Sequence, residues 1–129
     1  MNNGNNRPAE LKNRLREALD DRGMKPIELA EKAGVPKSMV SYYLSGKNVP
    51  KADRVYKMAH VLGVNEAWLL GYDVPKVRTP EQKKNDTMVG VVSKLRNDPE
   101  FFEVVAQLAE LPAEEYTSLK SIISALRKK

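Results

Sequence analysis

The sequence of 129 residues contains no cysteine and a single histidine, His60. Without thiols, a disulfide and a thiolate metal site are both excluded, and one histidine without HExxH spacing does not make a zinc site. No run of about 18 apolar residues is present, so no transmembrane helix is expected. The N-terminal stretch MNNGNNRP lacks the apolar core of a signal peptide, which favours a cytoplasmic protein. We expect no metal, no other cofactor and no membrane partner.

Patterns typical of catalytic sites are also missing. The sequence has no glycine-rich phosphate loop, and its acidic pairs are adjacent residues on predicted helices, where neighbouring side chains diverge by about 100°. The pairs Asp20-Asp21 and Glu114-Glu115 therefore do not form an acid/base dyad. We expect a protein that is not an enzyme, and we interpret His60 as an ordinary residue on the face of a helix.

Positive charge is concentrated in the first part of the chain. Residues 1–71 hold 12 Lys and Arg against 8 Asp and Glu, whereas residues 87–129 hold 6 of each and are neutral. Residues 72–86 add one net positive charge, with 4 basic and 3 acidic side chains. A basic N-terminal part favours a polyanionic partner such as nucleic acid, although many basic domains bind other partners.

Apolar residues recur at helical spacing throughout, and no run of β-branched residues alternates with polar ones, so the sequence predicts an all-α fold. Glycines and prolines mark the helix ends: Gly23, Gly34 and Gly46 each follow a predicted helix, and Pro26 opens one. The prolines and charges between the two apolar parts indicate a linker. The predicted organisation is a disordered tail at 1–8, a five-helix domain at 9–71, a linker at 72–86 and a helical segment at 87–129.

The short helix predicted at residues 37–45 follows another short helix through the tight turn Gly34-Val35-Pro36, an arrangement typical of a helix-turn-helix. At about 100° per residue, Val40, Tyr43 and Leu44 share one face of this helix. The opposite face is rich in serine, although serine is a poor helix former. Short hydroxyl side chains suit a helix that approaches base edges closely, and a lysine at its tip suits guanine. The exposed face is predicted to consist of Lys37, Ser38, Ser41, Tyr42 and Ser45.

The stretch ELAEKAGVPKSMVSYYLSGK, followed by MAHVLGVNEAWLLG, resembles the lambda repressor/Cro (XRE-type) helix-turn-helix family over about residues 9–71. The end of this region, AWLLGYDVP, is similar to the corresponding part of temperate-phage repressors. The resemblance implies a five-helix lambda-repressor-like domain that binds double-stranded DNA. It also implies base contacts from Lys37, Ser38, Ser41 and Tyr42, and phosphate contacts from Lys25, Ser45, Lys47, Asn48 and Lys51.

Two positions depart from this family. Members commonly carry a glutamine near the start of the second helix that reaches a phosphate, whereas this chain has Pro26, so the contact is lost or passes to Lys25. Some members bury an arginine–glutamate pair between the first helix and the recognition helix, at positions that correspond to Leu19 and Leu44. Replacement of a buried ion pair by packed apolar residues is often neutral or stabilising, so we expect the fold to be retained.

Many repressors of this family also carry a self-cleaving peptidase domain, which cuts an Ala-Gly bond. The only Ala-Gly pair here is Ala33-Gly34, within the helix-turn-helix, and residues 87–129 are too few to form that domain. Self-cleavage is therefore not expected. Of the aromatic residues in this region, Trp68 is assigned to the core, and Tyr43 is expected to be partly buried against the fourth helix.

The C-terminal segment is predicted to form three amphipathic helices, and its length is near the lower limit of about 40 residues for an independent fold. Its apolar residues therefore need a partner, which is either a second copy of the chain or the first domain of the same chain. Dimerisation is the simpler hypothesis, because a helix-turn-helix reads one half-site of a two-fold operator. We expect the last helix to pack on the helix at residues 101–108. The residues assigned to oligomerisation are Phe101, Phe102, Val105, Leu108, Tyr116, Leu119, Ile123 and Leu126.

These patterns predict a sequence-specific, nucleoid-associated transcriptional regulator, most simply a phage or mobile-element repressor that binds its operator as a dimer or higher oligomer. The alternative is an antitoxin-type or protein-interaction regulator that acts mainly through its C-terminal helices. An antirepressor or a protease is left open as a further partner.

Overall fold

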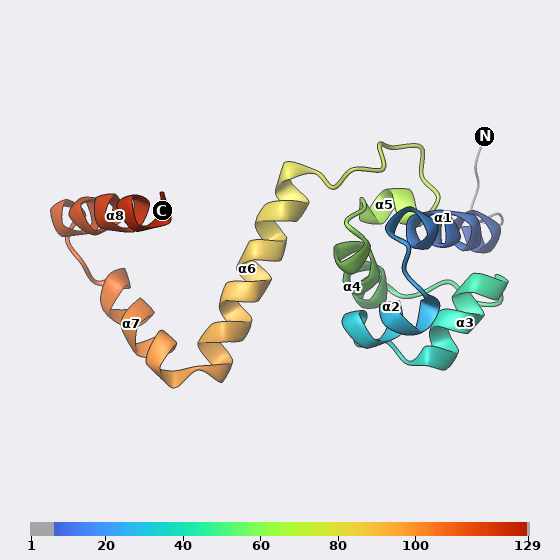
Figure 1. Ribbon diagram of the computed structural model, residues 1–129, viewed down its shortest axis with the longest axis horizontal. Helices are drawn as coiled ribbons and strands as arrows, with labels where there is room; N and C mark the ends of the chain where they lie inside the picture. The colour runs from blue at the N-terminus through green and yellow to red at the C-terminus, as the bar shows by residue number, and fades with distance from the viewer. Residues whose placement is uncertain (1–6, 129) are drawn as a thin grey trace. The chain divides into compact units, whose positions relative to one another are not determined.

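The computed structural model describes residues 7–128, and within them the only pairing of extended backbone is an isolated bridge between Val64 and Val77. The predicted all-α fold is confirmed. Figure 1 shows the helices of the described chain in order. They are α1 (Arg7–Arg22), α2 (Pro26–Ala33), α3 (Lys37–Ser45), α4 (Ala52–Leu62), α5 (Glu66–Leu69), α6 (Pro80–Asn97), α7 (Pro99–Ala109) and α8 (Ala113–Arg127).

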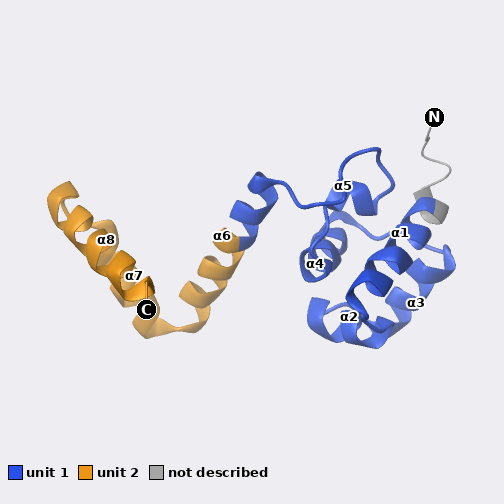
Figure 2. Cartoon of the chain, turned by 45° about the horizontal axis from the view of Figure 1, so that its top comes forward, with its two compact units in different colours: residues 1–86 blue, residues 87–129 orange. Residues whose placement is uncertain are grey.

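The chain divides into two compact units, which we call unit 1 (Met1–Asp86) and unit 2 (Thr87–Lys129), as coloured in Figure 2. In unit 1, α1 packs on α3, α4 and α5, and α2 packs on α3 and α4. The apolar faces of these helices meet in one core, and Trp68 belongs to it, as the sequence predicted. The largest aliphatic side chains without exposed surface are Leu11, Leu15, Leu29, Met58 and Leu69.

The helix boundaries of unit 1 follow from local sequence. Pro26 is the first residue of α2, where a missing N–H is harmless. Gly34 ends α2 with a φ of 67°, and its N–H donates to the carbonyl of Ala30. Only glycine adopts this conformation without strain, so the turn into α3 depends on it. Asn65 caps α5 by accepting hydrogen bonds from the backbone N–H groups of Ala67 and Trp68.

Both ends of unit 1 differ from the predicted organisation. Helix α1 begins at Arg7, so Arg7 and Pro8 are helical although they fall in the expected tail; residues 1–6 lie outside the described residues. Helix α6 begins at Pro80, so residues 80–86 are helical where the sequence indicated a linker. A capping box explains this start. The backbone N–H of Thr79 donates to Gln82 Oε1 at 3.0 Å, and the backbone N–H of Gln82 donates to Thr79 Oγ1 at 3.1 Å.

The rest of the expected linker is attached to α1. Arg14 Nη1 donates to the carbonyl oxygens of Trp68 and Tyr72, each at 2.6 Å. Lys76 Nζ forms ion pairs with Asp21 and with Glu17, and the hydrogen bonds to these carboxylates raise the pKa of Lys76 above its ordinary value. Through Tyr72 and Lys76, the non-helical part of residues 72–86 is therefore held against α1.

A buried ion pair fixes the first turns of α6 to the same unit. Arg78 is 6% exposed, and its guanidinium donates to both oxygens of Asp86, at 2.9 and 2.7 Å, and to the carbonyl of Val64 at 2.8 Å. Burial alone would raise the pKa of the Asp86 carboxyl. The hydrogen bonds and the charge of Arg78 instead hold this pKa below its ordinary value, and His60, whose Nδ1 lies 3.3 Å from Asp86 Oδ2, lowers it further. His60 also stacks on Tyr56, with ring centroids 5.8 Å apart, so it is more than an ordinary helix-face residue.

Unit 2 contains no buried residue among those the structure describes. Asp98 caps α7 by accepting from the backbone N–H of Phe101, and Lys94 Nζ lies 4.7 Å from the centroid of the Phe101 ring. The expected packing of α8 on α7 is wrong in this structure, because the two helices make no extensive contact. Of the apolar stripe of α8 only Leu119 is half-buried, whereas Tyr116 and Ile123 are 54% and 47% exposed. The exposed apolar side chains of unit 2 are Met88, Val89, Val91, Val92, Phe102, Val104, Tyr116, Ile122, Ile123 and Leu126.

Leu19 and Leu44 are both buried, at 3% and 9% exposure, where the family resemblance places an ion pair. A carboxylate at residue 44 would therefore be buried without a partner. We expect Leu44→Glu to lower the free energy of unfolding by about 3 kcal/mol or more, whereas Ser41→Glu on the exposed face of α3 should change it by about 0.5 kcal/mol or less. Urea denaturation of both variants measures this difference, and equal stabilities would show that α3 is rotated from the orientation described.

The Arg78–Asp86 pair predicts a pH-dependent contribution to stability. Asp86→Ala leaves a buried guanidinium without its carboxylate, and we expect a loss of about 3 kcal/mol at neutral pH. Because the folded-state pKa of Asp86 is lowered, this contribution is complete above the unfolded value of about 3.9 and disappears as pH falls through the folded value. Urea denaturation of wild type and Asp86→Ala between pH 7 and acid conditions should show converging stabilities. Asp73→Ala, at an exposed site, is the control and should match wild type throughout.

Candidate nucleic-acid interface

The candidate interface is built on α2, the turn after it and α3. The turn is short because Gly34 adopts a left-handed conformation and Val35 N–H donates to the carbonyl of Ala30 at 3.1 Å. Pro36 is the N-cap of α3, so the second helix starts directly after the turn. Val35 is 4% exposed and anchors the turn in the core. The two helices therefore have a fixed relative orientation, set by packing and by backbone geometry.

Helix α3 has one buried and one exposed face. Val40 and Tyr43 are each 1% exposed, and Leu44 is also buried. The burial of these residues confirms the predicted orientation of the helix, and Tyr43 is more deeply buried than the sequence suggested. The residues predicted to contact bases all lie on the exposed side: Lys37, Ser38, Ser41 and Tyr42.

Two side chains at the end of α3 form a small cluster. Lys47 Nζ lies 5.6 Å from the centroid of the Tyr42 ring, close enough for a cation–π interaction. Ser45 Oγ donates to the carbonyl oxygen of Tyr42 at 2.9 Å. The hydroxyl proton of Ser45 is therefore engaged, and this bond must break before Ser45 can donate to a phosphate. Tyr42 and Lys47, predicted separately as a base contact and a phosphate contact, are adjacent.

The other predicted phosphate contacts come from the segments that flank the helix-turn-helix. Lys25 precedes α2, and its backbone N–H donates to Glu28 Oε1 at 3.2 Å, so its position is set by the start of the helix. Asn48 lies in the loop after α3, and Lys51 is the N-cap residue of α4. All three residues are exposed. The ammonium groups of the two lysines and the amide of Asn48 are therefore accessible to a polyanion.

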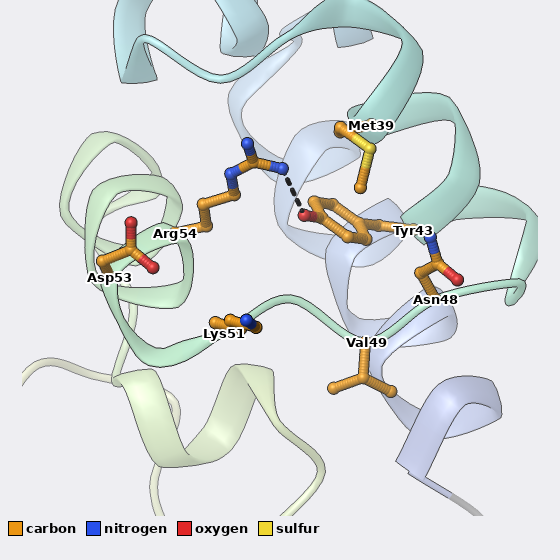
Figure 3. A pocket seen from close by; sticks show the side chains of 7 residues that line it. All are labelled: Met39, Tyr43, Asn48, Val49, Lys51, Asp53 and Arg54. Atoms are coloured by element: carbon orange, nitrogen blue, oxygen red, sulfur yellow. Dashed lines mark hydrogen bonds between the residues drawn. The ribbon is translucent and has the colours of Figure 1, made fainter.

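Sequence reasoning missed Arg54, in the first turn of α4. Arg54 Nη1 donates to the hydroxyl oxygen of Tyr43 at 3.1 Å, and this hydrogen bond raises the pKa of the guanidinium. Both side chains line a pocket of about 470 Å³ beside the loop that follows α3, and Figure 3 shows the hydrogen bond between them. Helical periodicity gave no signal for this contact, because it joins two helices through one side chain from each. The pocket is lined by Met39, Tyr43, Asn48, Val49, Lys51, Asp53 and Arg54.

Other kinds of site find no support in the part of the chain that the structure describes. Within residues 7–128, no group of three or more His, Asp and Glu side chains is placed to hold a metal ion. In the same residues, no helix combines the length and the apolar character needed to cross a membrane.

Two short helices joined by a tight turn, the second with a polar exposed face, define a DNA-binding helix-turn-helix domain. The comparison with protein families agrees, since residues 15–69 match the family model described as Helix-turn-helix. This part of the chain is therefore a helix-turn-helix domain of the kind found in DNA-binding transcriptional regulators, in agreement with its resemblance to the lambda repressor-like (XRE-type) family. The comparison with curated proteins gives no match.

Proposed function

We propose that this protein is a sequence-specific repressor of a phage or mobile element, which occupies an operator as a dimer or higher oligomer and blocks polymerase. The observation that carries this proposal is the exposed face of α3, which combines three short hydroxyl side chains with Lys37 at its tip and Tyr42 beside them. An exposed helix face kept only for solubility would favour longer charged side chains, which are better helix formers. The short polar surface supports close approach to bases.

In this proposal, the exposed face of α3 enters the major groove. Lys37 at its N-terminal end donates to a guanine, and the hydroxyls of Ser38 and Ser41 donate to or accept from base edges. Tyr42 contacts a base or the adjacent backbone with its ring beside Lys47. Phosphate contacts from Lys25, Ser45, Lys47, Asn48 and Lys51 set the register of the helix but carry no sequence information themselves.

Unit 2 supplies the second element of the proposal, which is self-association. Residues 87–129 are neutral in net charge, so they add no net electrostatic attraction for DNA. Their described part contains no buried residue and exposes apolar side chains on all of its helices. A segment of this size without a core is not stable alone, and a second copy provides a complementary apolar surface. Two linked helix-turn-helix domains then bind two half-sites of an operator.

The same exposed apolar residues favour a second candidate function. If unit 2 binds a different protein, the chain is an antitoxin-type or protein-interaction regulator, with DNA binding as one of two activities. An antirepressor or a protease would be a partner of the same kind. The oligomeric state of the pure protein separates the two functions, because self-association requires no other chain.

The assignment of base contacts and phosphate contacts predicts two different effects of mutation on DNA binding. Lys37→Ala and Tyr42→Ala should each cost about 1–3 kcal/mol on the specific site and relax the sequence preference there. Lys47→Ala should weaken binding to every sequence and lower the slope of log K against log salt by about one. The operator is first selected from a random duplex library, and affinities are then measured on it and on unrelated DNA at several salt concentrations. Uniform loss of affinity in all three variants would show that the base contacts are misassigned.

The self-association proposal predicts that a charge on the apolar stripe of α8 separates the subunits. Sedimentation velocity of the wild-type chain at micromolar concentration should show a dimer or larger species. Ile123→Asp should shift it to monomer without loss of helix content, because Ile123 is already 47% exposed in the single chain. Ser121→Asp, on the opposite side of α8, introduces the same charge and should leave the oligomer intact. A monomeric wild-type protein would contradict self-association and favour a partner protein.

A further inference from the structure

Arg54 is held in place by a core residue of the recognition helix. The ring of Tyr43 is buried in unit 1, at 1% exposure, so its hydroxyl oxygen is a fixed acceptor at the edge of the core. Arg54 Nη1 donates to that oxygen at 3.1 Å, and Figure 3 shows this bond between two of the side chains that line the pocket. An exposed arginine normally samples many rotamers, and this bond restricts it. The position of the Arg54 guanidinium therefore follows the position of α3.

The pocket in front of Arg54 has the composition of an anion site. Its lining contains the cationic side chains of Arg54 and Lys51 and the amide of Asn48, against one carboxylate, Asp53. A guanidinium has five N–H donors, and the bond to Tyr43 uses one of them. The remaining donors form a planar fork that matches the oxygens of a phosphate. Lys51 and Asn48 were assigned to phosphate contacts from the sequence, whereas Arg54 was given no role.

We propose that Arg54 binds a phosphate of the DNA backbone in this pocket and that Tyr43 is its positioning residue. This inference deepens the proposed DNA-binding function and rests on it. The loop between α3 and α4 provides the other donors, and a helix-turn-helix places such a loop over the backbone beside the groove that its second helix enters. A single hydrogen bond then links the buried side of α3 to a phosphate contact. Because Tyr43 belongs to α3, the position of this helix in the groove also determines the position of the Arg54 guanidinium at the DNA backbone.

The experiment uses the full chain and a random-sequence duplex, with affinity measured over a series of chloride concentrations. Arg54→Ala should lower the slope of log K against log salt by about one, as expected for the loss of one phosphate contact. Arg54→Lys keeps the charge without the planar fork, so it should retain the slope but bind more weakly than wild type. Arg96→Ala, an exposed arginine of α6 in unit 2, makes the same change in net charge and should leave the slope unchanged.

Tyr43→Phe tests the positioning role, because it removes only the hydroxyl and keeps the buried ring. Affinity for the duplex should fall by about three- to tenfold, with the circular dichroism and melting curve of a folded protein. In the double variant with Arg54→Ala, Tyr43→Phe should cause no further loss, since both act on one contact. Additive losses, or an unchanged affinity of Tyr43→Phe, would contradict the positioning role.

The outcomes separate this inference from the proposed function. If the wild-type chain fails to bind duplex DNA in a salt-dependent way, the proposed function is wrong and this inference is overturned with it. If the wild type binds and Arg54→Ala keeps the full slope, this inference alone is overturned. A last experiment adds inorganic phosphate at constant ionic strength and measures the melting temperature. Suppose that phosphate raises the melting temperature of the wild type but not of Arg54→Ala, while Arg54→Ala leaves the salt slope of DNA binding unchanged. The pocket would then bind free phosphate, and the proposed DNA contact would be overturned.

Discussion

The burial of one face of α3 is the interaction on which the rest of unit 1 depends. Val40, Tyr43 and Leu44 are enclosed by the core, and their positions fix the rotation of a helix of only nine residues. A helix of that length is not stable in isolation, so packing rather than propensity keeps it helical. This explains how α3 tolerates serines on its other face. The stability of the helix comes from its buried side, and its exposed side is left free to be chosen for recognition.

The helices and the orientation of α3 could be predicted because their determinants are local. Gly34, Pro26 and Asn65 act within a few residues of themselves, and the spacing of apolar residues gives the buried face directly. The contacts that the sequence did not reveal lie outside the repeat of a single helix. Arg54 and Tyr43 are on two different helices, and Arg78 precedes the helix that carries Asp86, so these side chains look like ordinary exposed residues in the sequence. Their partners are defined only by the tertiary fold.

The two units divide the charge and the apolar surface of the chain between them. Unit 1 carries the excess of basic residues and buries most of its large apolar side chains in one core, whereas the described part of the chain after residue 86 buries none and the sequence there is neutral. The helix-turn-helix therefore has the surface expected for contact with a polyanion, and the C-terminal helices have a surface suited to another polypeptide. The predicted packing of α8 on α7 fails within this exposed surface, where Tyr116 and Ile123 are not covered.

The start of α6 inside unit 1 has a consequence for how the chain opens. Its first residues, 80–86, are fastened by the capping box and by Arg78, while the following turns, from Thr87 on, have no buried side chain among the described residues. One continuous helix thus crosses a boundary between two levels of local stability. We expect backbone amides before that boundary to open only when unit 1 unfolds, and those after it to open by fraying of an exposed helix. The boundary between the two units would then be a step in local stability within α6 rather than a break in its secondary structure.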